Sequence, residues 1–458
     1  MSGRRLLPGL AWSSVLAALW SAAAAGLVCT GHLVAAAMLA GVPGLVVVAQ
    51  RLRNLVVLLG LSLPFPLSLV PEATGLHVAA SDLLLAVLAA LVVVALFADP
   101  DAAVWRRLGP AVGVCLPYLG WCVVLLAAHP SVRAVLQTSQ RLELFALPLV
   151  VGVLVALRGL EWAALRAYVV SATVLAALYP IFGTGGGGLG VQKNPAGQFI
   201  ANALILLLAA RPLRTRPMLA AVPVLTLGLL WTQSRGALAS MACAAVVLLA
   251  TAPGAERWRL AMLLVPVGLC AATAFTLLPD DAQQRNTDFS ATSGTDAARS
   301  LQIRAGFSRE ARGLIRAEPV FGAGIGEYPT GVPGHRTSSE DPHQVLLLQA
   351  AEGGYPLAVT FVLLVGGAVV MVWRRRRNGP VPAAAAAVLL ASVAHGFVDV
   401  YWVRGTPVLG WLLVGVAIGL GPARTSARTS ARTSARRERS PLVEPVRSRT
   451  LEGVGRGA

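Results

Sequence analysis

Long runs of apolar residues recur along the whole chain, and they constrain its fold more than any other feature. One run, LLLAVLAALVVVALFA, covers residues 83–98 without a charged side chain. Its length approaches the ~20 residues that cross the ~30 Å hydrocarbon core of a bilayer as a helix. Only 13% of the 458 residues are charged, and 56% are hydrophobic. We therefore expect an all-α, polytopic bundle of about 12–14 transmembrane helices over residues 1–421.

The predicted spans are defined by the polar segments between the apolar runs. They lie near residues 11–29, 32–50, 54–70, 82–98, 109–127, 142–157, 165–183, 197–210, 218–232, 237–252, 260–278, 355–373, 381–396 and 405–421. The longest connection, residues 279–345, lacks the composition of a linker. A loop of this length is usually functional, and we expect it to contain helices.

The arginines between the spans predict the orientation of the chain. With a cytoplasmic amino terminus, alternate connections carry Arg51, Arg53, Arg106, Arg107, Arg158, Arg166, Arg211, Arg214, Arg216, Arg257, Arg259 and Arg374–Arg377. The remaining short connections carry few basic residues, as the positive-inside rule requires. We therefore expect both termini to be cytoplasmic and the loop at 279–345 to lie outside. The replacement of almost every lysine by arginine indicates a high-GC bacterial genome, so the membrane is that of a bacterial cell.

Other functional classes find little support in the composition. The net charge of +17 comes from short arginine clusters between spans, which topology explains, so we expect no nucleic-acid partner. The five cysteines lie in or at the ends of apolar runs and show neither a disulfide framework nor a metal-ligand spacing. The tail, residues 422–458, repeats the unit ARTS three times and is predicted to be disordered and cytoplasmic.

A few basic residues fall on the predicted outer side, and two of them stand at helix starts. Lys193, in VQKNPAGQ, is the only lysine of the chain, and we expect Asn194 and Pro195 to turn the chain into the next span. Arg235, in TQSRGALASM, lies where Ser234 and Gly236 suit a reversal between two helices. Cations at this surface either bind a phosphate or anchor the helix ends at the interface.

The long loop contains a predicted amphipathic helix, TDAARSLQIRAGFSREARGLIRAEP, at residues 295–319. Its apolar face holds Phe307, Ala311, Leu314 and Ile315, and its opposite face holds Arg309, Arg312 and Arg316. Such a helix either lies on the membrane or caps a cavity, and its arginines suit phosphate or form a solvated face. The glycines of the following PVFGAGIGEYP lack the preceding strand of a dinucleotide site, so we expect them to permit tight packing or turns.

Two histidine-containing segments complete the outer surface. In SSEDPHQVLLLQAAEGGYP, His343 precedes an apolar helix, and it is the side chain best suited to accept a proton near neutral pH. The EGGYP at its end predicts a bend, with Glu352 beside it. Near the carboxyl end, HGFVDVYWVRG places His395, Asp399 and Arg404 at another outer boundary. A charged side chain such as that of Asp399 is energetically costly in an apolar segment unless it pairs with an opposite charge or faces a water-filled cavity.

These motifs, in this order, resemble the O-antigen ligase/polymerase family of membrane glycosyltransferases over residues 180–420. The family often shows His–Asn where this chain has His343–Gln344, and an arginine where it has Lys193. The resemblance implies transfer of a glycan from a polyprenyl-diphosphate carrier to an acceptor hydroxyl at the outer face, with no metal or other cofactor. The acceptor is a glycan, a lipid or a wall polymer. The resemblance fits a polymerase and a ligase equally, since the two differ in their acceptor.

The residues and the resemblance together give one hypothesis for the site. His343 is the catalytic base on the acceptor, and Arg235 and Lys193 hold the diphosphate as it leaves with inversion. Arg304, Arg312 and Asp399 are further candidates for binding the diphosphate. The alternative is a secondary transporter of a glycan or small anion. Transporters often carry two matching halves, and no internal repeat is evident here.

Overall fold

All regular elements in the described part of the chain are helices. The computed structural model describes residues 52–66, 78–98, 102–182, 191–213, 215–252, 257–258, 261, 296–328, 342, 344–397 and 405–421. The predicted spans near 11–29, 32–50 and 260–278 and the tail lie outside these residues, apart from Ala261. The protein is an all-α polytopic membrane bundle, as the apolar runs predict.

The described helices, in chain order, are α3 (Leu52–Ser62), α4 (Ala80–Ala98), α5 (Ala102–Ala128), α6 (Val132–Arg141), the π-helix η2 (Leu142–Ala146), α7 (Leu147–Leu157), α8 (Glu161–Phe182), α9 (Lys193–Ala209), α10 (Thr215–Thr232), α11 (Arg235–Thr251), α14 (Asp296–Ala317), α15 (Val345–Arg375), α16 (Pro380–Gly396) and α17 (Val408–Leu420). The longest intervals between these helices separate α11 from α14 and α14 from α15.

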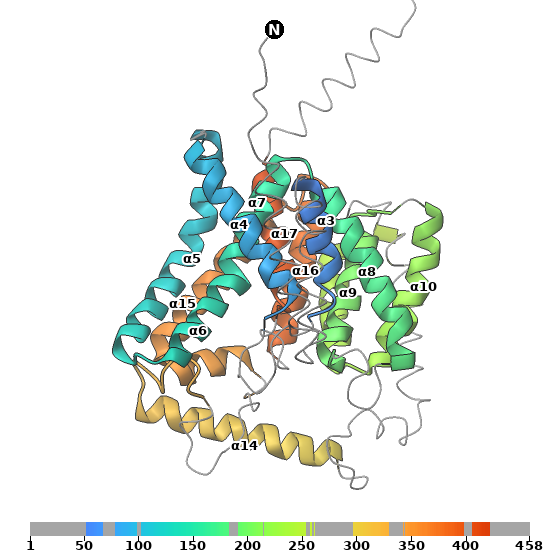
Figure 1. Ribbon diagram of the computed structural model, residues 1–458. Coiled ribbons are helices and arrows are strands. Elements are labelled where there is room, and N and C mark those ends of the chain that lie inside the picture. Colours follow the sequence, from blue (N-terminus) through green and yellow to red (C-terminus); the bar gives the residue numbers. More distant parts are fainter. Residues whose placement is uncertain are drawn as a thin grey trace, which may run out of the picture.

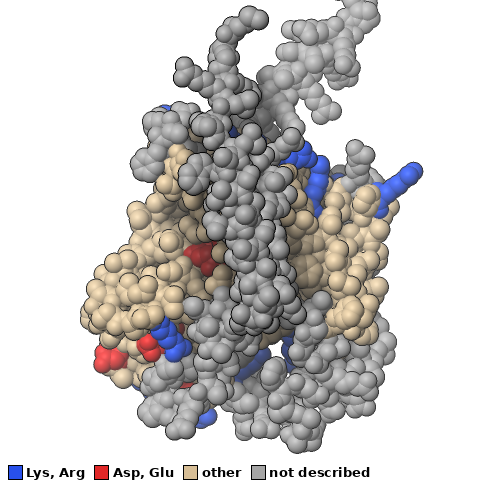
Figure 2. Space-filling model, viewed as in Figure 1, with Lys and Arg blue, Asp and Glu red and all other residues tan. Residues whose placement is uncertain are grey.

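The distribution of apolar and charged residues is that of a membrane protein. Four described segments are long and apolar enough to cross a bilayer: Val104–Ala128, Val132–Leu157, Glu161–Phe182 and Val345–Arg375. Shorter apolar helices stand beside them. Figure 2 shows basic side chains near the upper and lower ends of one face, with a mostly uncharged band between them.

Small residues bring the central helices into close contact. α7 and α17 pack along most of their length, and Gly152 of α7 faces Gly415 of α17. A Cβ added to Gly419, four residues later, would lie 2.7 Å from Ala156 Cβ. Helices in lipid associate through such small residues because the hydrophobic effect does not drive them together. The pair occupies the centre of the bundle in Figure 1.

The connectivity gives the bundle two distinct ends. At the arginine-rich end, α3, α5, α8 and α10 begin, and α7, α15 and α17 end. Arg107, near the start of α5, donates a hydrogen bond to the Gly419 carbonyl of α17, which ties two of these termini together. At the opposite end, α9, α11 and α15 begin, and α14 lies across the helix ends in Figure 1. We call this the α14 end.

One predicted span differs strongly from the structure. The span predicted at 142–157 begins ten residues earlier, so that the transmembrane segment is Val132–Leu157. The sequence-based boundary was set by the polar residues before Leu142, among them Arg141. That arginine is only 7% exposed and forms a buried ion pair with Glu352. Because its charge is compensated, the helix continues past it.

Candidate active site at the α14 end

The amphipathic helix α14 covers one part of this end of the bundle. Its apolar face is buried as predicted: Phe307, Ala311 and Ile315 are at most 6% exposed, and Leu314 is half-buried. Ala311 and Ile315 pack against Ala350 and Ala351 of α15. The predicted opposite face, Arg309, Arg312 and Arg316, is exposed. Because α14 lies across the helix ends rather than along them, it caps the bundle (Figure 1).

The segment after α14 is bound to a break in α15. Gly353 and Gly354 depart from helical geometry, with φ of +67° at Gly354, so the predicted bend is confirmed. The break frees backbone groups, which pair with residues 319–324. Ala323 N donates to Ala351 O and Gly324 N to Glu352 O, both at 2.9 Å, and Tyr355 N donates to Pro319 O at 2.8 Å.

The glycines of this segment are required by its close contact with α15. A Cβ added to Gly322, which has φ of +63°, would lie 2.6 Å from the backbone of Glu352 and Gly353. One added to Gly354 would collide with the Val320 carbonyl. Glycine alone combines positive φ with so close an approach at little steric cost. The prediction that these glycines permit tight packing and turns is confirmed.

A buried ion pair supports the same break from inside the bundle. Arg141, at the end of α6, pairs with Glu352, which is 4% exposed, and the other oxygen of Glu352 accepts from Gly326 N at 3.0 Å. Arg141 also donates to Tyr118 Oη and Gln349 Oε1, each at 3.2 Å. Each charge is thus compensated by an opposite charge and by hydrogen bonds, which an ion pair out of water requires.

Two further helix starts meet at this end, and each carries one basic residue. Lys193 is the first residue of α9, and Arg235 is the first residue of α11. Gly197 lies one turn after Lys193, and a Cβ on it would lie 2.8 Å from Ser234 Cβ and 2.9 Å from Thr232 Oγ1. Because Ser234 directly precedes Arg235, this contact brings the two helix starts side by side.

The local structure explains why each helix starts where it does. Ser234 caps α11 by accepting a hydrogen bond from Ala237 N at 3.2 Å, and Gln233 adopts φ of +51°, which confirms the predicted reversal. The prediction that Asn194 and Pro195 turn the chain before the next span is wrong, since both belong to the first turn of α9. Proline is tolerated there because the first amides of a helix have no intrahelical acceptor.

A buried polar network fixes α9, α11 and α16 beneath Lys193 and Arg235. The His395 ring donates from Nδ1 to Gln198 Oε1 at 2.6 Å, and Ser240 donates to the same oxygen at 2.6 Å. Gln198 in turn donates to Asn202 Oδ1 at 2.9 Å. None of these four side chains has measurable exposure. The His395 ring also lies against Gly236, where a Cβ would collide with it.

The remaining predicted site residues differ in position. Arg304 is half-exposed and shares the bundle-facing side of α14 with Ala311 and Ile315, at i+7 and i+11. Arg312 is exposed, and its Nε donates to Ser308 O of its own helix at 2.9 Å. His343 and Asp399 lie outside the described residues. The structure thus brings Lys193 and Arg235 together and turns Arg312 outward.

Several residues of this end were not singled out by the sequence. Tyr118, Trp121 and Gln349 lie in apolar runs and have no motif of their own. Trp121 donates from Nε1 to Gly353 O at 3.1 Å and stacks on Phe321, with ring centroids 6.1 Å apart. Gln198 and Asn202 carry a usable signal: two amides at i, i+4 inside an apolar helix indicate a shared polar face.

The described residues include no group of three or more His, Cys, Asp and Glu side chains placed to hold a metal ion. What they do place at one end are two basic helix starts, at Lys193 and Arg235, and an amphipathic helix packed on α15. The fold and this site together define a polytopic membrane protein with two basic helix starts side by side at one end.

One region of the chain is similar to a known family. Residues 219–362 match the sequence model of the family described as O-antigen ligase. The match covers 144 of the 458 residues and supports the resemblance to the O-antigen ligase/polymerase family over that region. The matched region includes Arg235, α14 and the break in α15. No curated protein matches the chain.

Proposed function

We propose that the protein transfers a glycan from a polyprenyl-diphosphate carrier to an acceptor hydroxyl at the α14 end, without a metal. The observation that carries this proposal is the juxtaposition of Lys193 and Arg235 on two neighbouring helix starts. Helix amino termini favour anions through their free amides and the helix dipole. A diphosphate placed between these two helix starts is attracted by both cations and by both helix dipoles.

The proposed reaction is a direct displacement at the anomeric carbon. His343 accepts the proton of the acceptor hydroxyl, whose oxygen then forms a bond to that carbon. The bond from the same carbon to the diphosphate oxygen breaks, and its electron pair leaves with the polyprenyl diphosphate. Attack opposite the leaving group inverts the configuration. The negative charge grows on the diphosphate in the transition state, where fixed cations stabilise it most.

The supporting groups have separate roles in this proposal. Lys193 and Arg235 hold the diphosphate, and Arg304, on the bundle-facing side of α14, extends the basic surface over it. Arg312 and Asp399 remain candidates for the same shell. α14 and the segment bound to the break in α15 cover the donor and exclude water, which would otherwise hydrolyse it. We place the protein in the bacterial cytoplasmic membrane, with the α14 end outside.

The proposal is tested with purified protein, a synthetic polyprenyl-diphosphate glycan and an acceptor glycan. Wild-type protein is expected to form product in the presence of a chelator. His343→Ala is expected to lose transfer by at least the ~100-fold of a general base, while still binding the donor. Product of near-normal amount and length from His343→Ala would overturn the assignment. Counterflow of free glycan in vesicles without any lipid-linked donor would instead support the transporter.

A further inference from the structure

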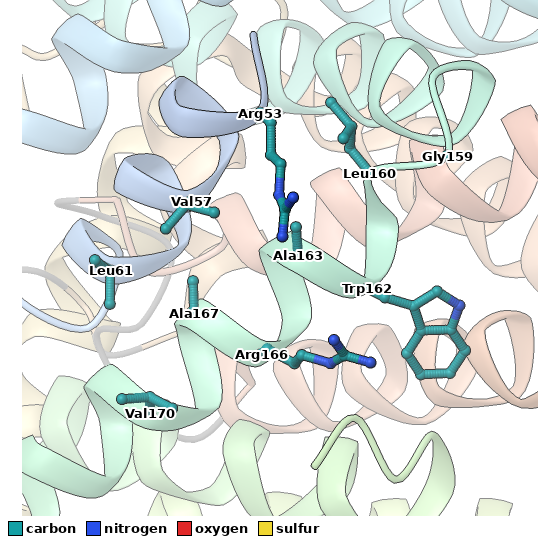
Figure 3. A pocket seen from close by; sticks show the side chains of 10 residues that line it. All are labelled: Arg53, Val57, Leu61, Gly159, Leu160, Trp162, Ala163, Arg166, Ala167 and Val170. Atoms are coloured by element: carbon teal, nitrogen blue, oxygen red, sulfur yellow. The ribbon is translucent and has the colours of Figure 1, made fainter. Parts of the chain in front are cut away.

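A groove lies between α3 and α8 at the arginine-rich end of the bundle, which is the end opposite to the proposed active site. It has a volume of about 530 Å³ and is open to the surroundings of the protein. Two arginines, Arg53 and Arg166, line it together with mostly apolar residues, among them Leu61 and Val170 (Figure 3). This volume falls within the ~300–1,000 Å³ typical of small-molecule sites.

The packing of α3 and α8 produces the groove. Both helices begin at the arginine-rich end, and they are closest where a Cβ on Gly60 would lie 2.7 Å from Ala164 O and 2.9 Å from Ala167 Cβ. The groove runs along the outside of this contact. Leu61 and Val170 are 38% and 47% exposed on its wall, and exposed apolar side chains on a membrane helix contact lipid chains.

The charge of the groove is entirely positive among its described lining residues. Figure 3 shows the side chain of Arg53 extending from α3 to beside Ala163, and that of Arg166 extending from α8 toward Trp162. Arg166 is held in place because its Nε donates to Pro212 O at 2.8 Å, a hydrogen bond that does not involve its two terminal nitrogens. The nearest acidic residue along the chain, Glu161, does not line the groove and is 7% exposed.

We propose that this groove binds one anionic glycerophospholipid, with its phosphate between Arg53 and Arg166 and its acyl chains along Leu61 and Val170. The arginines suit a phosphate because one guanidinium group can donate two parallel hydrogen bonds to two phosphate oxygens. The apolar wall selects a lipid over a soluble phosphate. Basic pockets between helix ends are known recognition sites for anionic headgroups. The bound lipid bridges α3 to α8, and the proposal is independent of the glycan transfer proposed above.

The test is native mass spectrometry of the full-length protein in detergent with added dioleoyl phosphatidylglycerol, dioleoyl phosphatidylcholine or inorganic phosphate. Wild-type protein is expected to retain one phosphatidylglycerol in preference to phosphatidylcholine, and excess inorganic phosphate is expected not to displace it. Each arginine removed is expected to weaken retention roughly five-fold, from the ~1 kcal/mol per basic residue at an anionic surface. Arg53→Gln with Arg166→Gln then loses roughly 25-fold.

Two control variants separate binding from folding. Arg53→Lys with Arg166→Lys keeps both charges and is expected to retain the lipid better than the Gln pair. Arg106→Gln removes an exposed arginine of α5 at the same end, outside the groove, and is expected to bind as wild type. Equal retention by wild type and the Arg53→Gln, Arg166→Gln variant would overturn the proposal. So would equal retention of phosphatidylcholine or displacement by inorganic phosphate.

Discussion

Removing the carboxylate of Glu352 tests the structural basis of the α14 end most sharply. Glu352 is 4% exposed, pairs with Arg141 and accepts from Gly326 N at 3.0 Å. Glu352→Ala leaves a buried guanidinium without its counter-ion and a buried amide without its acceptor. Breaking a buried pair on one side costs roughly 3–5 kcal/mol, because the remaining charge stays out of water. We expect the free energy of unfolding to fall by that amount.

The assay is reversible unfolding in mixed micelles, combined with a double-mutant cycle. Arg141→Met is expected to destabilise the protein for the converse reason, since it leaves the carboxylate buried. The double variant Arg141→Met, Glu352→Ala closes the cycle and removes both charges. It is expected to be at least ~2 kcal/mol more stable than the sum of the two single effects predicts, because no uncompensated charge remains.

Amide hydrogen exchange measures the effect of the same substitution on individual segments. In Glu352→Ala the amides of Gly322–Gly326 are expected to exchange faster, because Glu352 fixes this segment to the break in α15. Amides in the core of α17, which does not contact the segment, serve as the internal reference. Single-variant losses below ~1 kcal/mol, or additive effects in the double variant, would refute the reasoning. Unchanged exchange at Gly322–Gly326 would refute the link between the ion pair and the segment.

Three further perturbations follow from the close contacts at the same end. Gly354→Ala should destabilise the protein by roughly 1–3 kcal/mol through strain at positive φ. Gly366→Ala, with open space beside it in the same helix, should not lower the melting temperature. Gly236→Ala should push the His395 ring out of its network at a cost of roughly 1–3 kcal/mol, and a wild-type melting temperature would contradict this contact. Lys193→Arg should keep donor binding and Lys193→Ala should weaken it; wild-type behaviour of both would make Lys193 a simple interfacial anchor.

Much of the architecture could be predicted from local pattern. The apolar runs gave the all-α membrane bundle, since a bilayer permits few other folds. The periodicity of residues 295–319 predicted α14 and its two faces, because burial of one face follows from a 3.6-residue repeat. The bend at Gly353–Gly354 and the reversal at Ser234 were also predicted, since glycine and a capping serine act locally.

The buried polar pairs could not be predicted from the sequence, because they depend on contacts between segments that are distant along the chain. Arg141 suggested a helix boundary because a lone charge inside a membrane is costly, and only the fold reveals Glu352 as its partner. The buried network of His395 and Gln198 likewise joins residues 197 positions apart. Tyr118 and Gln349 look like ordinary members of apolar runs until the helices are packed. Pairing of this kind is a tertiary property and leaves no periodic trace.

Binding of polyprenyl diphosphate to purified protein is the most direct test of the proposed active site. The comparison needs wild type, Arg235→Ala at the α14 end and Arg216→Ala, an exposed arginine in the first turn of α10 at the opposite end. Loss of a charged hydrogen bond predicts at least a ~10-fold rise in the Kd of Arg235→Ala, and no change in Arg216→Ala. A wild-type Kd for Arg235→Ala, or an equal loss in both variants, would contradict a diphosphate site built on the helix starts of α9 and α11.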